Sequence, residues 1–306
     1  MRIKIISTVS LLFGLINGLV AQSDVKLSNY LLNPLIYNPA YAGSYQGLTV
    51  TSIYSSQWVG FEGAPQTIFL SGHKKIDDMV GLGVDVMNDR IGATNESKII
   101  GNYAYHVNLD DEWKLSMGLK AGLSSYTIDY GLLSIYNPSE FNDVNEKITT
   151  LTPVFGAGFY LHKDGFFAGV SIPNMVPYKK IDSYRYKQVN AALSYYVTSG
   201  YKFEMDRGFV IEPTILTRLT LGSPVSIIPA LNFNWNNDFY ASVNYESNAS
   251  IGAFLGCRVA ESFTLGYAFD SSTNRFNNYN GGIHTLFLNF KLDNWWSGDV
   301  HSTFTF

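Results

Sequence analysis

The chain has 306 residues, a formal net charge of −4, and only 15% charged residues, where about 25% is usual. Aromatic residues make up a further 15% and mean hydropathy is near zero. The mild acidity argues against a nucleic-acid partner, and a single cysteine, Cys257, excludes an intrachain disulfide. Because the chain also lacks a twenty-residue apolar stretch, this composition is typical of a membrane β-barrel.

Residues 1–21 are predicted to form a secretory signal peptide. Arg2 and Lys4 supply its positive end, residues 5–20 its apolar core, and Ala21 the small residue before the cleavage point. An uncleaved membrane anchor is the alternative, but polar chain follows at once. We therefore expect an exported protein.

Residues 22–47 are predicted to be a periplasmic N-terminal segment. Its centre reads N-P-L-I-Y-N-P-A-Y-A-G-S, residues 33–44, with Asn-Pro steps at Asn33 and Asn38. Each Pro fixes φ, removes a backbone donor and biases the preceding Asn toward extended geometry, so we expect neither a helix nor a central strand here. A stiff segment loses little entropy on docking, which suits contact with a partner or with the rest of the protein.

Residues 48–292 are predicted to form an all-β fold, a transmembrane antiparallel β-barrel of about fourteen strands in an outer membrane. A barrel strand alternates apolar lipid-facing residues with small or polar lumen-facing ones. Residues 263–270, F-T-L-G-Y-A-F-D, show this alternation most clearly. The predicted strands start near Leu48, Thr67, Met79, Ser97, Lys114, Leu151, Phe166, Gln188, Phe209, Val225, Phe239, Ser250, Phe263 and Ile283.

The lengths of the predicted connections differ between the two ends of the barrel. Connections after even-numbered strands are all short, whereas residues 129–150, 173–187 and 270–282 form long ones after odd-numbered strands. Bacterial barrels have short periplasmic turns and longer external loops, so the N-terminus is expected in the periplasm. A soluble sandwich or propeller is the alternative, but its outward faces should carry more charge.

Three prolines and the C-terminal residues fit this scheme less well. Pro153, Pro213 and Pro229 fall within predicted strands, where Pro removes a ladder donor, so we expect them at bulges, at strand ends or at a weakly paired seam. Residues 293–306 form either a periplasmic tail or the end of the last hairpin. Their two tryptophans, at 295 and 296, suit a membrane interface.

Few residues point to catalysis. The five histidines, His73, His106, His162, His284 and His301, belong to no H-E-x-x-H motif, and neither a Cys pair nor G-x-S-x-G is present. The Gly-rich pieces lie in predicted strands and lack the helix of a phosphate loop. The protein is therefore predicted not to be an enzyme and to need no cofactor or metal, although a Ser–His esterase or acyltransferase is an alternative.

Eight charged residues are predicted to face the lumen. They either line a solute channel or pair across the lumen and stiffen the barrel. They are Asp85, Lys114, Lys120, Glu212, Arg218, Glu246, Arg258 and Asp270.

Four motifs in a fixed order resemble the PorP/SprF family, outer-membrane proteins of the type IX secretion system of Bacteroidota. These motifs are Y-N-P-A-Y-A-G-S (37–44), Q-W-V-G-F-E-G-A-P-Q-T (57–67), G-L-G-V followed by N-D-R-I-G (81–92), and S-I-P-N-M (171–175). The resemblance covers nearly the whole mature chain. The combination of the first two motifs is the specific part.

The resemblance implies a barrel that supports secretion or surface attachment of client proteins, including gliding adhesins. Its implied partners are the periplasmic secretion machinery and a secreted client or adhesin, within outer-membrane lipid; no catalytic residue is carried over. A general diffusion porin is the alternative. The motif residues are expected either to dock a partner or plug the barrel base, or to cover the periplasmic rim and shape the first external hairpin. They are Asn38, Pro39, Ala40, Gly43, Gln57, Trp58, Gly63, Ala64 and Pro65.

Overall fold

The computed structural model describes residues 30, 32–45, 47–61, 63–132, 147–176, 179–182, 187–190, 193–247, 249–273 and 281–292. The predicted signal peptide, residues 1–21, and the predicted tail, residues 293–306, lie outside the described residues. Among the residues described, no helix has the length and apolar character needed to cross a membrane.

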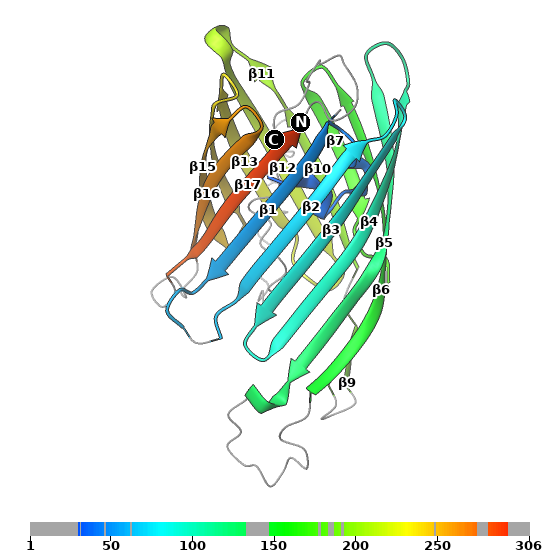
Figure 1. The fold of residues 1–306 in the computed structure, drawn as a ribbon, viewed down its shortest axis with the longest axis vertical. Coiled ribbons are helices and arrows are strands. Elements are labelled where there is room, and N and C mark those ends of the chain that lie inside the picture. Colours follow the sequence, from blue (N-terminus) through cyan, green and yellow to red (C-terminus); the bar gives the residue numbers. More distant parts are fainter. Residues whose placement is uncertain are drawn as a thin grey trace, which may run out of the picture.

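Fourteen antiparallel strands close into one barrel, which confirms the predicted fold class (Figure 1). The ring closes where β1 pairs with β17 and β10 pairs with β12. The barrel strands are β1 (Leu48–Gln57), β2 (Gln66–Lys75), β3 (Val80–Ile91), β4 (Thr94–Asn108), β5 (Lys114–Asp129), β6 (Lys147–Lys163), β7 (Phe166–Ile172), β10 (Ser194–Tyr201), β12 (Phe209–Thr220), β13 (Ser226–Trp235), β14 (Phe239–Glu246), β15 (Ser250–Ala260), β16 (Phe263–Ser272) and β17 (Ile283–Leu292).

The remaining described elements are short. β11 (Phe203–Glu204) pairs with the start of β12, and β8 (Lys179–Asp182) pairs only with β9 (Lys187–Asn190). Four 3₁₀ helices are also present: η2 (Pro34–Ile36), η3 (Pro39–Tyr41), η4 (Tyr130–Leu132) and η6 (Asp206–Gly208).

Side chains alternate between an exposed apolar outer wall and a buried lumen. In β16, Leu265, Tyr267 and Phe269 are exposed, whereas Ala268 and Asp270 are buried. An outward row of large apolar side chains is expected where a wall faces lipid. The period-two pattern therefore reflects the two environments of each strand.

One predicted strand is wrong in position. The barrel strand expected to start near Gln188 begins at Ser194, because residues 187–190 form β9 and pair locally with β8 outside the barrel. The strands expected to start near Ser97 and Leu151 begin earlier, at Thr94 and Lys147, and lengthen the hairpins at that end. Every other start lies within one residue of its predicted position.

The connections differ between the two ends as expected. The end that holds the start of β1 and the end of β17 carries short turns, such as residues 164–165 between β6 and β7. The opposite end carries the long connections after β5, β7 and β16, but also the two-residue turn between β3 and β4 (Figure 1). By the usual asymmetry of bacterial barrels, the short-turn end is periplasmic.

The three strand prolines lie where their strand is paired on one side only, which is the weakly paired position among the alternatives expected. The β6–β7 and β13–β14 ladders begin at Ala157 and Ala230, beyond Pro153 and Pro229, and the pairings of β12 with β10 and β11 leave Pro213 out. Pro153, Pro213 and Pro229 sit inside β6, β12 and β13, paired in register with Leu123, Leu231 and Ile215. No register shift occurs at these positions, so they occupy neither bulges nor strand ends. Their rings contribute to the exposed outer wall.

Candidate functional site: the N-terminal segment in the lumen

The N-terminal motif folds as two single-turn 3₁₀ helices, contrary to the expectation of no helix. The side chains of Asn33 and Asn38 accept hydrogen bonds from the backbone N–H groups of Leu35 and Ala40, at 3.2 and 3.0 Å. A proline in the first position of a helix loses no bond, because its missing N–H would be unsatisfied there. Each Asn-Pro step therefore starts a helix that stops after one turn.

Tyr30 and residues 32–44, here called the plug segment, lie inside the ring of strands (Figure 1). Leu35, Ala40 and Ala42 have no exposed surface, and Asn38 is only 2% exposed. The segment contacts strands on several sides of the barrel, as the following contacts show. It is therefore packed into the lumen rather than laid along the rim.

Asn38 joins the plug segment to β6. Its Nδ2 donates to the carbonyl oxygen of Phe159 at 3.0 Å, while its Oδ1 caps the helix that follows. A Cβ on Gly158 would lie 2.2 Å from that Oδ1, and one on Gly169 would lie 3.0 Å from Nδ2. Only a wall without side chains at these positions can receive the Asn38 amide.

Two further glycines give the backbone of the plug segment its room. A Cβ on Gly118 of β5 would lie 2.0 Å from the backbone nitrogen of Ala40. A Cβ on Gly81 of β3 would lie 2.1 Å from the carbonyl oxygen of Ala42. The lumen-facing glycines of β3, β5 and β6 therefore form a cradle shaped to this segment.

Buried charges also hold the plug segment. Lys120, 4% exposed, donates from Nζ to the carbonyl oxygens of Leu35 and Ile36 at 3.3 and 2.9 Å. Its electrostatic partner Asp85, 2% exposed, accepts hydrogen bonds from Ser71 Oγ and Asn102 Nδ2, both at 2.7 Å. Lys120 thus binds the backbone of the plug segment, and Asp85, held by two strand side chains, is its counter-charge, which offsets the cost of burying both groups.

Two histidines bind the plug segment where it reaches the short-turn end. The backbone N–H of Gly43 donates to His73 Nδ1 at 3.2 Å, so this nitrogen carries no proton. His106 Nε2 donates to the carbonyl oxygen of Ala42 at 3.0 Å, and its Nδ1 bonds Ser116 Oγ at 2.6 Å. One imidazole that accepts and one that donates therefore hold the plug segment at this end.

Apolar and aromatic side chains fill the lumen around the plug segment. Leu32 packs in a cluster with side chains from seven strands, including Phe254 and Phe287. Tyr30 and Tyr37 belong to a second cluster, in which the Tyr37 ring stacks on Tyr196 at 5.9 Å between centroids. Tyr30 also bonds Thr214 of β12 at 2.7 Å through its hydroxyl. The segment thus closes a small hydrophobic core.

The other half of the predicted motif residues lies at the opposite end of the barrel. Gln57 ends β1, and Trp58, Gly63, Ala64 and Pro65 belong to the loop that leads to β2. Pro39, Ala40 and Gly43 lie in the plug segment near the short-turn end. The structure therefore does not bring the two halves of the motif together in one site.

The remaining predicted lumen charges have separate environments. Arg218 Nη2 lies 3.8 Å from Glu246 Oε1, which accepts from Ser226 Oγ at 3.3 Å. Asp270 is buried and Glu212 half-buried, whereas Lys114 is exposed at the start of β5. Of these charges, Glu212 interacts electrostatically with Tyr30 and Tyr41 of the plug segment.

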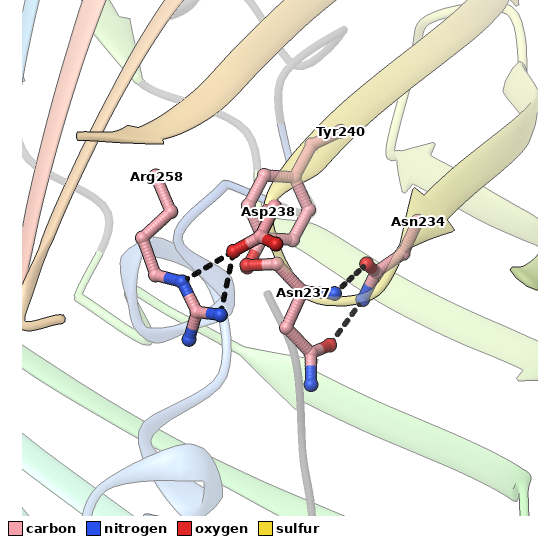
Figure 2. A network of polar contacts seen from close by, with 5 residues as sticks. All are labelled: Asn234, Asn237, Asp238, Tyr240 and Arg258. Carbon is pink, nitrogen blue, oxygen red and sulfur yellow. Dashed lines mark hydrogen bonds and ion pairs between the residues drawn. The ribbon is translucent and has the colours of Figure 1, made fainter. Parts of the chain in front are cut away.

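Arg258 lies near the end of β15, at the short-turn rim, and Figure 2 shows its contacts with the neighbouring turn. Its Nε and Nη2 donate to Asp238 Oδ1 at 2.9 and 2.6 Å. Asn234 and Asn237 bond each other across the same β13–β14 turn, and the Tyr240 hydroxyl donates to the carbonyl oxygen of Asn237 at 2.7 Å. This network joins the end of β15 to the β13–β14 turn, so Arg258 belongs to the rim.

Sequence reasoning missed several residues of this site. It named Gly81 as the start of a family motif and His73 and His106 as histidines outside any catalytic motif, but gave none of them a contact with residues 40–43. The alternation in β17 places Phe287 on the lumen face, and a large aromatic residue at a lumen position signals a filled lumen. Within the described residues, no group of three potential metal ligands occurs.

Comparison with known proteins confirms the resemblance. The family model of the type IX secretion system membrane protein PorP/SprF matches residues 19–290. Similar solved structures include Omp33 of Acinetobacter baumannii (TM-score 0.49, 9% identity, 82% of this chain and 100% of that chain) and the toluene transporter TbuX of Ralstonia pickettii (0.49, 9%, 83% and 91%). The CymD monoaromatic hydrocarbon channel is also similar (0.44, 10%, 90% and 96%).

No curated protein matches the chain. Because the family model covers most of the sequence, this outer-membrane chain belongs to the PorP/SprF family of type IX secretion system membrane proteins.

Proposed function

We propose that the protein is a sealed barrel that supports secretion or surface attachment of exported client proteins by binding them. Its partners are the periplasmic secretion machinery on the short-turn side and an exported client, such as a gliding adhesin, on the other side. It acts without catalysis and without a cofactor. Family membership supports the link to secretion, and the filled lumen supports binding over conduction.

The observation that carries the proposal is the occupation of the lumen by the plug segment. A diffusion porin needs a continuous water-filled path lined by polar side chains. Here Lys120 donates hydrogen bonds to a bound segment of the same chain, and aromatic clusters surround that segment. Such a barrel offers a fixed platform at two membrane surfaces.

The plug segment has a structural role in this proposal, and its rigidity presents a defined short-turn face. Asn38, Pro39, Ala40 and Gly43 hold the segment in place, and partner binding at this end depends on the shape they maintain. A double change of Asn38 and Pro39 to Ala is expected to leave the barrel inserted but to weaken retention of the periplasmic machinery.

The experiment that tests the function compares surface and medium proteomes with and without this gene, with the restored gene as the control. We expect loss of at least one exported protein from the cell surface, which returns with the restored gene. The number of proteins lost distinguishes a dedicated partner from a general component. Unchanged proteomes would contradict the proposed function.

A further inference from the structure

The β1–β2 loop exposes three apolar side chains at the end opposite the short turns. Trp58, Val59 and Phe61, here called the apolar tip, are 45%, 57% and 59% exposed. They lie in the second sequence motif, which the plug segment does not use. Large apolar groups exposed together on a loop mark a surface that binds something.

The backbone of this loop is held by hydrogen bonds within it and to both neighbours. Such a loop keeps one shape before binding, and a preformed surface loses little entropy when a partner docks. Within the loop, the backbone N–H groups of Gln57, Phe61 and Ala64 donate to the carbonyl oxygens of Pro65 (2.9 Å), Trp58 (3.1 Å) and Phe61 (3.3 Å), respectively. Two more bonds join the loop to its neighbours: the N–H of Trp58 donates to the carbonyl oxygen of Gly282 (3.1 Å), and the N–H of Gly92 donates to that of Gly63 (2.9 Å).

Trp58 has a strained backbone that fixes the direction of its side chain. Its φ is +51°, in the left-handed region that bulky residues rarely adopt. Gly60 and Gly63, at φ +99° and +74°, complete the turn without strain. Strain at an exposed aromatic residue is an observation that points to function.

A polar row separates the apolar tip from the lipid-facing wall. Directly paired outward residues cross β4, β3, β2, β1 and β17 just before the loop. The next paired positions toward the membrane include the apolar Ile68, Tyr54 and Leu286. The residues of the polar row are Asn95, Arg90, Gln66, Ser56 and His284.

We propose that the apolar tip docks into an apolar pocket on an exported client protein at the cell surface. The polar row places the tip beyond the apolar wall, so protein rather than acyl chain is its partner. Trp is one of the residue types enriched among binding hot spots, and rigid aromatic groups suit that role. This inference rests on the proposed function, and it assigns the binding of the client to the apolar tip.

The test uses the full chain with the double change Trp58→Gly and Phe61→Ser. Glycine accepts φ +51° without strain, so the barrel should fold and insert as before. Leu221→Ser is the matched control, because Leu221 is an equally exposed apolar residue, 65% exposed, on the β12–β13 loop at the same end.

The readout is the exported protein whose surface retention depends on this gene, measured on cells and in the medium. We expect the double variant, at unchanged barrel level, to shift at least about tenfold more of that protein into the medium than the Leu221→Ser control. If gene deletion releases the protein and the double variant retains it, the inference fails and the proposed function stands. If deletion releases nothing, the proposed function itself fails.

A second measurement tests the lipid alternative. In vesicles of brominated phospholipid, the fluorescence difference between the native chain and Trp58→Phe reports the contribution of Trp58 alone. We expect this contribution to remain unquenched, because the tip stands beyond the polar row. Strong quenching would overturn the inference by showing that the tip is a membrane anchor.

Discussion

Asn38 shows at the scale of one residue how the plug segment is held. Its amide caps η3 and bonds the β6 carbonyl of Phe159, two interactions in a site that is 2% exposed. Alanine loses both and leaves polar backbone groups buried. We expect Asn38→Ala to lower the free energy of unfolding by about 2 kcal/mol, the sum of a lost cap and a lost buried hydrogen bond.

Urea unfolding of the reconstituted barrel, followed by tryptophan fluorescence, measures this loss. Asn174→Ala is the control, because Asn174 also accepts a hydrogen bond from a backbone N–H, that of Val176 at 3.1 Å, but lies in the less buried connection after β7. Its effect should stay within about 0.5 kcal/mol. Equal losses of unfolding free energy for the two variants would show that the Asn38 contacts stabilise the barrel no more than those of Asn174.

Glycine at position 118 gives a sharper test of the cradle. A Cβ there would lie 2.0 Å from the backbone nitrogen of Ala40, whereas one on Gly101 of β4 would find its nearest neighbour at 3.7 Å. We expect Gly118→Ala to cost about 1–3 kcal/mol by overpacking and to raise hydrogen exchange of the amides at 35–42. Gly101→Ala should leave exchange unchanged, and the same exchange in both variants would contradict the packing described.

At the scale of one element, the Asp110 carboxylate stabilises the turn between β4 and β5. The Asp110 carboxylate accepts the N–H groups of Trp113 and Glu112 at 2.7 and 2.9 Å. These bonds lower the pKa of Asp110 below its ordinary value. A lowered folded-state pKa means that Asp110 stabilises the turn at neutral pH and that this contribution is lost as pH falls through the folded-state pKa.

An NMR titration of the Asp110 carboxyl carbon in the folded chain and in urea tests this direction. The folded midpoint is expected at lower pH than the unfolded one. Asp110→Asn keeps an acceptor oxygen and removes the titration, so it should abolish the low-pH change of the Trp113 amide signal. Equal midpoints in the two states would contradict the pKa direction.

Most of the strands could be predicted because the residue types along each strand alternate with the environments of its two faces. The alternation of residues 263–270 follows directly from lipid on one side and lumen on the other. The strand expected at Gln188 could not be placed, since β8 and β9 are four-residue segments whose pairing with each other has no periodic signal. Pro229 looks like an interruption in the sequence, yet it lies within β13, because it pairs with Ile215 of β12 and the β13–β14 ladder begins only at the next residue, Ala230.

At the scale of the whole molecule, the filled lumen could be predicted only in part. The sequence shows that residues 33–44 are stiff and uncharged, and that Gly81 lies in a predicted strand. It does not show that Gly81, Gly118 and Gly158, which are far apart in the chain, meet one segment. That meeting depends on the barrel register, which local patterns do not contain.

The central claim is that the barrel is sealed by its own N-terminal segment. Single-channel recording of the intact mature chain in planar lipid bilayers tests it most directly, with insertion checked by the heat-dependent gel shift of folded barrels. We expect inserted protein with no steady conductance, because the plug segment and its aromatic neighbours occupy the lumen. Persistent open channels from the intact chain would contradict the sealed barrel and favour a diffusion porin.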